Sequence, residues 1–139
     1  MERTEISRYT GQGETILAIE SDELMRELIS EVLTMYGYKV HVVRNIREAT
    51  HSYSAQPEQF QLILADLWLA GLSDMLAEVL RTHPNMSVVL TSDHPLQNRY
   101  YRHLGLSILE KPFDITELFF ALRMALEHEN SFWSKRHLN

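Results

Sequence analysis

Polar residues that could accept and hold a phosphoryl group follow four short apolar segments of the sequence. In chain order they are Glu20-Ser21-Asp22, Asp66, Thr91-Ser92-Asp93 and Glu110-Lys111-Pro112. A carboxylate can attack a phosphoryl group to form an acyl phosphate, provided that cations neutralise the phosphoryl oxygens. A lysine supplies one such charge, and Mg2+ held by one or two carboxylates supplies more. The residue types that this chemistry needs are therefore all present.

Asp66 is the candidate nucleophile. It follows the continuous apolar segment QLILA and precedes a second apolar stretch, LWLAGL. A charged residue between two apolar segments is poorly explained as part of an ordinary solvated loop. Simpler explanations stay open for its companions, because Ser21 and Asp22 are good helix N-cap residues and Asp93 could start the next helix. The four groups together are a stronger signal than any one of them.

Apolar runs and stretches of helical periodicity alternate along the chain. The predicted strands are residues 15–19, 39–43, 61–65, 86–91 and 106–109, and the predicted helices are residues 22–36, 46–55, 73–82, 95–104 and 114–128. This alternation predicts a parallel sheet with helices on both faces. Ligands of open parallel sheets bind beyond the carboxyl ends of the strands, so the four polar groups should meet at that edge.

Two of the predicted helices have a clear apolar face, which we expect to be buried. In the first helix this face consists of Met25, Leu28, Ile29, Val32 and Tyr36, and in the last helix it consists of Ile115, Leu118, Phe119, Leu122 and Leu126. Gly37 stands where a left-handed C-cap of the first helix is wanted. Phe120 and Met124 lie off the last apolar stripe.

Length and composition fit one globular domain. The chain has 139 residues, of which 45% are hydrophobic, with no cysteine and a net charge of −6. We assign residues 1–13 to a mobile leader or linker, residues 14–128 to the domain, and residues 129–139 to a polar tail. The sequence lacks the basic stripe of a nucleic-acid binder, an apolar run that could span a membrane, and the apolar core of a signal peptide. We therefore expect a cytoplasmic protein with no nucleic-acid or membrane partner.

Residues 14–128 resemble the receiver domain of bacterial two-component response regulators. The matching segments are ILAIESDELMREL at 16–28, LILADLWLAGL at 62–72, VVLTSD at 88–93 and LEKPFD at 109–114. The resemblance implies an α/β, flavodoxin-like (βα)5 three-layer sandwich with a five-stranded parallel sheet in the order 2-1-3-4-5. It also implies a signalling domain rather than an enzyme, either as a single-domain regulator or as the C-terminal receiver of a hybrid histidine kinase.

The resemblance also assigns roles to individual residues. Asp66 would accept a phosphoryl group from a histidine kinase or phosphotransfer domain, and Thr91 and Lys111 would hold that group. Glu20, Asp66 and the backbone carbonyl of Trp68 would bind Mg2+.

Three positions depart from the family pattern. Ser21 stands where the family usually has an acid that binds the metal directly, so we expect weak Mg2+ binding unless Glu20 or Asp22 compensates. Ala70 replaces a usual proline. Ile108 replaces the aromatic residue of the usual threonine–aromatic switch, and the loop before it is one residue shorter than is usual.

Two functions are compatible with these residues. Asp66, Thr91 and Lys111 favour a phosphorylatable receiver. Ser21 and Ile108 favour a pseudo-receiver, which is an interaction module that signals without phosphorylation. A flavin-binding module of the flavodoxin type would share the architecture, but ESDELM is not the Ser/Thr/Gly-rich phosphate loop that it would need after the first strand.

A partner surface is expected on the face formed by residues 95–104, 106–109 and 114–128. Phe120 and Met124 would contribute apolar side chains to it, and only one of the neighbouring residues Tyr100 and Tyr101 can easily point inward. Many receivers dimerise on this face, so the resemblance implies a homodimer there. Without an aromatic switch, we expect phosphorylation to control that dimer only weakly.

Overall fold

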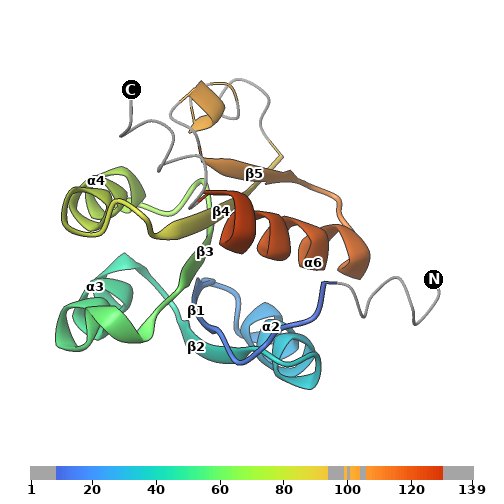
Figure 1. The fold of residues 1–139 in the computed structure, drawn as a ribbon. Helices are drawn as coiled ribbons and strands as arrows, with labels where there is room; N and C mark the ends of the chain where they lie inside the picture. The colour runs from blue at the N-terminus through green and yellow to red at the C-terminus, as the bar shows by residue number, and fades with distance from the viewer. Residues whose placement is uncertain (1–8, 94–98, 100, 104–105, 130–139) are drawn as a thin grey trace.

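The computed structural model describes residues 9–93, 99, 101–103 and 106–129 of the chain. Five parallel strands form one sheet in the order β2-β1-β3-β4-β5 (Figure 1), as predicted. The strands are β1 (Thr15–Ile19), β2 (Lys39–Val43), β3 (Leu62–Asp66), β4 (Ser87–Ser92) and β5 (Ser107–Glu110). The helices are α2 (Glu23–Met35), α3 (Ile46–Ala55), α4 (Leu72–Thr82) and α6 (Ile115–Met124), with a 3-10 turn η1 (Pro57–Gln59) and a π-helical turn η2 (Ala125–Glu129).

The fourth predicted helix, 95–104, falls mostly outside the described residues. Those of its residues that the structure describes, 99 and 101–103, are helical. Phe132 and Trp133 of the predicted tail also lie outside the described residues. In the part of the chain that is described, no helix is long and apolar enough to cross a membrane.

Local sequence signals explain where the helices begin and end. The side chain of Asp22 accepts a hydrogen bond from Met25 N–H and caps α2, while Asn45 caps α3 in the same way. Asp114 and Glu117 form a reciprocal capping box at the start of α6. Gly37 has a φ of 99°, which confirms the left-handed turn predicted after the first helix.

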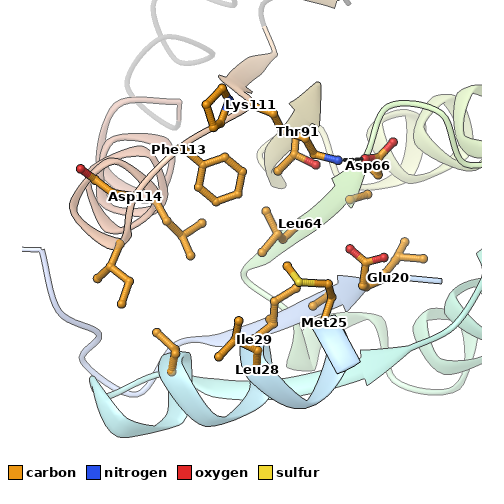
Figure 2. A pocket seen from close by; sticks show the side chains of 17 residues that line it. Glu20, Met25, Leu28, Ile29, Leu64, Asp66, Thr91, Lys111, Phe113 and Asp114 are labelled. Carbon is orange, nitrogen blue, oxygen red and sulfur yellow. Dashed lines mark hydrogen bonds and ion pairs between the residues drawn. The ribbon is translucent and has the colours of Figure 1, made fainter. Parts of the chain in front are cut away.

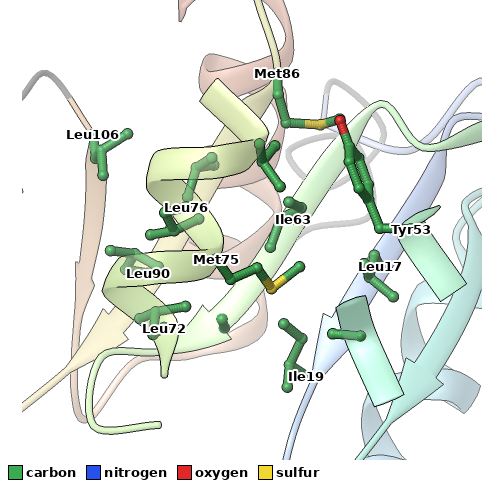
Figure 3. Packing of buried hydrophobic residues seen from close by; sticks show 14 of the residues in the cluster. Leu17, Ile19, Tyr53, Ile63, Leu72, Met75, Leu76, Met86, Leu90 and Leu106 are labelled. Atoms are coloured by element: carbon green, nitrogen blue, oxygen red, sulfur yellow. The ribbon is translucent and has the colours of Figure 1, made fainter. Parts of the chain in front are cut away.

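Two apolar clusters lie on opposite faces of the sheet, because successive strand residues point to opposite sides. Leu17 and Ile19 of β1 pack with α3 and α4 in the cluster that Figure 3 shows. Ile16 and Ala18 pack on the other face with residues of α2 and α6. Strands β1, β3 and β4 are thus covered on both sides, as their continuous apolar runs predicted.

Three strands are shifted by one residue from the prediction. Strands β3, β4 and β5 each begin and end one position later than predicted. The parallel register pairs Asp66 with Thr91 and Ser92 with Glu110, so these four polar residues occupy the last one or two positions of their strands. Backbone pairing therefore fixes the positions of the residues that we expected to do chemistry.

The predicted burial of three apolar side chains is wrong. Met25 and Leu28 of α2 are 40% and 49% exposed, and Ile115 of α6 is 39% exposed. All three line a cavity between the two helices, so the periodicity placed them on the correct face but that face is incompletely covered at this end. Leu33, which was not in the predicted stripe, is fully buried.

The predicted mobile leader, residues 1–13, is in contact with the domain from Tyr9 onward. Gly11 N–H donates to Tyr36 O, and Gly13 N–H donates to Gly37 O. These backbone hydrogen bonds attach residues 9–13 to the turn between α2 and β2. The contacts of the domain therefore include residues that precede its predicted start at residue 14.

Candidate functional site

Asp66 lies at the carboxyl end of β3 and is held from two sides. Lys111 Nζ is 2.5 Å from Asp66 Oδ2, and Trp68 N–H donates to Asp66 Oδ1 at 2.8 Å. Figure 2 shows the lysine reaching Asp66 from the segment that follows β5. The two carboxylate oxygens thus have separate donors, which fixes the orientation of the carboxylate.

Backbone hydrogen bonds beyond the strand ends position these groups. Leu67 N–H donates to Thr91 O at 2.9 Å, and Lys111 N–H donates to Ser92 O at 2.8 Å. These bonds continue the sheet ladder past Asp66 and Glu110 and bring Lys111 to the edge where Asp66 lies. This edge is the one at which open parallel sheets bind their ligands.

Thr91 is the partner of Asp66 in the register of β3 and β4, and both residues line the same cavity. Ser92, the next residue, is fully buried. Glu20 of the loop after β1 lines the cavity from the opposite side (Figure 2). Four of the predicted site residues, Glu20, Asp66, Thr91 and Lys111, are thus brought together as expected.

The loop between β1 and α2 is held by its own polar groups. Glu20 Oε2 accepts a hydrogen bond from Asp22 N–H at 3.0 Å, and the Asp22 side chain caps α2. Arg26 Nη1 donates to the backbone carbonyls of Glu20 and Ser21 at 3.0 and 2.9 Å. Asp22 is therefore engaged in capping, which was the simpler of its two predicted roles.

Ser21 is exposed and lies outside the set of described residues that line the cavity. The residue predicted to be a weakened metal ligand is therefore not among the residues that line the cavity with Glu20, Asp66, Thr91 and Lys111. Within the described part of the chain, no cluster of three or more His, Asp or Glu side chains could hold a metal ion. Glu20 and Asp66 are two carboxylates that line the same cavity, and Mg2+ commonly takes one or two carboxylates and completes its shell with water.

An apolar cavity of about 600 Å3 adjoins the polar group. Its walls come from α2, with Met25, Leu28 and Ile29, and from the start of α6 with Phe113 before it, as Figure 2 shows. Leu64 forms part of its floor. Sequence reasoning missed this cavity, because periodicity gives the face of each helix but not the space left between two helices.

The residues of the expected partner surface are only partly described. Tyr101 is buried, and its hydroxyl is hydrogen-bonded to Ser73 Oγ at 2.8 Å, whereas Tyr100 lies outside the described residues. Phe120 is 46% exposed, as expected for a residue off the apolar stripe. The ring of Tyr9 packs edge-on against it at 5.3 Å between centroids. The homodimer remains a prediction.

Comparison with known proteins agrees with the fold. The family model described as the response regulator receiver domain matches residues 16–123. No curated protein matches the chain.

Several solved structures share the architecture. A response regulator receiver domain protein from Clostridium thermocellum is 19% identical with a TM-score of 0.75, over 86% of this chain and 98% of that one. The non-phosphorylated HemR receiver domain from Leptospira biflexa is 24% identical with a TM-score of 0.72, over 82% and 94% of the two chains. NtrX from Brucella abortus in complex with ADP is 22% identical with a TM-score of 0.76, and the match covers 91% of this chain but 30% of NtrX. At these identities the likeness concerns the fold, whereas the family model covers most of the sequence, and the chain therefore belongs to the response regulator receiver domain family.

Proposed function

We propose that this receiver domain is phosphorylated on Asp66 by a histidine kinase or a phosphotransfer domain, and that it signals through the resulting change in conformation. The observation that carries the proposal is the ion pair between Lys111 Nζ and Asp66 Oδ2, at 2.5 Å, at the edge of a cavity that Thr91 also lines. This arrangement supports the proposal, because a carboxylate, an ammonium group and a hydroxyl line the same cavity.

The reaction is a transfer between two nucleophiles. An oxygen of Asp66 forms a bond to phosphorus while the phosphorus–nitrogen bond of the phosphohistidine breaks, and the imidazole nitrogen keeps the electron pair and takes up a proton. Trp68 N–H holds the carboxylate in a fixed orientation during the attack. Lys111 can move from the carboxylate to an oxygen of the transferred group, where a charge-assisted hydrogen bond is strong.

Magnesium would add positive charge at the phosphoryl oxygens, and Glu20, Asp66 and the carbonyl of Trp68 are the residues that would hold it. Because Ser21 is neutral and exposed, we propose that this binding is weak. The domain would act as a signalling module rather than as an enzyme with a separate substrate.

Exposed apolar side chains around the site support a protein as the phosphoryl donor. Met25, Leu28 and Ile115 are partly exposed on the two helices that border the cavity, and Trp68, two residues after the acceptor, is 55% exposed. A tryptophan and apolar side chains of this kind are typical of the central part of protein interfaces. A helical partner that carries a phosphohistidine could bury them as it approaches Asp66.

The second candidate function is a pseudo-receiver that binds partners without being phosphorylated. It is favoured by the position of Ser21, which leaves the site one carboxylate short. The two functions differ in whether Asp66 becomes modified, so one measurement separates them.

The test is the intact mass of the full chain after incubation with acetyl phosphate and Mg2+. We expect the addition of one phosphoryl group to the wild type and to Asp93→Asn, an exposed acid near the site that serves as control. We expect no addition to Asp66→Asn. Labelling that persists in Asp66→Asn would show that another residue is the acceptor. A wild type that neither acetyl phosphate nor histidine kinases can label would favour the pseudo-receiver.

A further inference from the structure

Residues 9–14, here called the N-terminal strap, are fastened to the end of the sheet opposite Asp66. The strap leads into β1 and lies beside the turn between α2 and β2, where two backbone hydrogen bonds of 2.8 and 2.9 Å hold Gly11 and Gly13. A Cβ atom on Gly11 would lie only 2.6 Å from the carbonyl carbon of Gly37. Two glycine backbones thus meet directly, and a larger residue at position 11 could not keep this contact.

Side chains fasten the strap to the second half of α6. Glu14 Oε2 pairs with Arg123 Nη1 at 2.5 Å, and both side chains are largely buried, being 18% and 9% exposed. The ring of Tyr9 contacts the ring of Phe120, and Tyr38 OH donates to Tyr9 O at 3.0 Å. An ion pair and an aromatic contact therefore bind the strap to α6, which lies far from it in sequence.

Helix α6 reaches from the strap to the phosphorylation site. Its first half contributes Ile115 and Leu118 to the cavity that Asp66 and Lys111 also line. Its second half carries Phe120 and Arg123, which hold the strap. The ten residues of α6 form one continuous, capped helix. Rigid secondary elements of this kind can carry coupling between sites at their two ends.

We propose that the strap is a regulatory contact, whose docking and release act through α6 on the acceptor site. This inference rests on the proposed function of Asp66. With the strap docked, α6 is held against the turn between α2 and β2, where Phe119 contacts the rings of Tyr36 and Tyr38. When the strap is released, α6 can shift, and with it the cavity wall and the segment that carries Lys111. The chain segment before Tyr9, or a partner that binds the strap, would then influence phosphorylation.

A purely structural strap would stabilise the domain without this coupling. The two cases differ in reciprocity, because a contact that affects ligand binding at a second site must itself be affected by that ligand. A phosphate mimic at Asp66 should therefore change how tightly the strap is bound. A structural strap would respond to its own mutation but not to the mimic.

The experiment measures hydrogen exchange of the strap and of α6 in the full chain, with and without beryllofluoride and Mg2+. We expect the exchange rate of the strap amides to change about fivefold or more on adding the mimic, a typical size for coupling between sites. The initial rate of phosphorylation by acetyl phosphate should also change in Gly11→Val, which cannot keep the glycine contact. Tyr9→Ala, which removes the ring contacts of Tyr9 but keeps the backbone hydrogen bonds of the strap, should show a smaller change in the same direction.

Gln12→Ala is the matched control, because the Gln12 side chain is exposed and the backbone N–H that bonds Glu14 is retained. Phosphorylation at equal rates in wild type, Gly11→Val and Tyr9→Ala, with strap exchange unaffected by the mimic, would overturn the inference and leave a structural strap. A wild type that acquires no phosphoryl group and does not respond to the mimic would contradict the proposed function itself, and the strap inference with it.

Discussion

Replacing Lys111 by methionine should separate the chemistry of the site from the stability of the fold. The Lys111 and Asp66 side chains are 40% and 21% exposed, so their ion pair is partly solvated. Pairs of this kind contribute about 0–1 kcal/mol to stability. Methionine keeps most of the apolar stem, and Asp66 can be hydrated once the amine is gone. We therefore expect Lys111→Met to lower the free energy of unfolding by no more than about 1 kcal/mol.

The effect on phosphorylation should be larger. Removing one donor that stabilises developing negative charge costs roughly 100-fold to 1,000-fold in enclosed enzyme sites. The site here is open to water at Lys111, which weakens the interaction. We expect the initial rate of acyl-phosphate formation to fall about 10-fold to 100-fold, or roughly 1.4–2.8 kcal/mol in activation free energy.

Urea unfolding gives the stability, and intact mass over time with acetyl phosphate gives the rate. Arg102→Met is the matched control. Arg102 forms an ion pair at 3.0 Å with Glu110, the residue before Lys111, and this pair is more exposed than the pair of Lys111 with Asp66. That variant should be labelled at the wild-type rate. Lys111→Met that is labelled as fast as the wild type would refute the role of the lysine. A loss of stability above about 2 kcal/mol, with labelling lost in parallel, would show that the pair is structural instead.

Two further changes probe the metal site and the strap. Ser21→Asp restores an acid at the usual metal position and should tighten Mg2+ binding about tenfold or more. The affinity is measured through the fluorescence of Trp68, with Trp133 as background. Equal affinities of wild type and variant would mean that the remaining carboxylates suffice. Burial alone would raise the pKa of Glu14, but hydrogen bonds from Gln12 N–H and Arg123 outweigh it and lower the pKa below its ordinary value of 4.5. The stabilisation from ionised Glu14 is therefore complete above about pH 4.5 and is lost as the pH falls through the lower folded pKa. Between pH 6 and pH 3, the urea concentration at the midpoint of unfolding should fall more steeply for the wild type than for Glu14→Gln. Parallel pH dependences of the two proteins would contradict this role of Glu14.

The parts of the fold that were predictable are those that local chemistry determines. Continuous apolar runs predicted the strands that are covered on both faces, and Asp22 and Gly37 predicted the two ends of the first helix. The polar residues at the strand ends met as expected, because parallel strands place all their carboxyl ends at one edge. Asp66 and Lys111, 45 residues apart, are brought together by topology alone.

The missed features depend on contacts that local patterns do not encode. Periodicity placed Met25 and Ile115 on the inner faces of α2 and α6, but the distance between those faces at the site depends on packing elsewhere along both helices. The strap was missed because its glycines carry no periodic signal. Gly11 is needed because its backbone lies very close to that of Gly37, and this contact joins residues far apart in sequence.

The loop after β1 links these observations to the chemistry of the site. Glu20 accepts a bond from Asp22 N–H, Asp22 caps α2, and Arg26 adds a positive charge at the carbonyls of Glu20 and Ser21. These contacts hold the loop in place but leave less negative charge for a metal ion than two adjacent acids would provide. If a phosphoryl group is bound here, a larger share of the neutralising charge must come from Lys111. Lys111→Met and Ser21→Asp thus alter the same quantity, the positive charge available to the phosphoryl oxygens, in opposite directions.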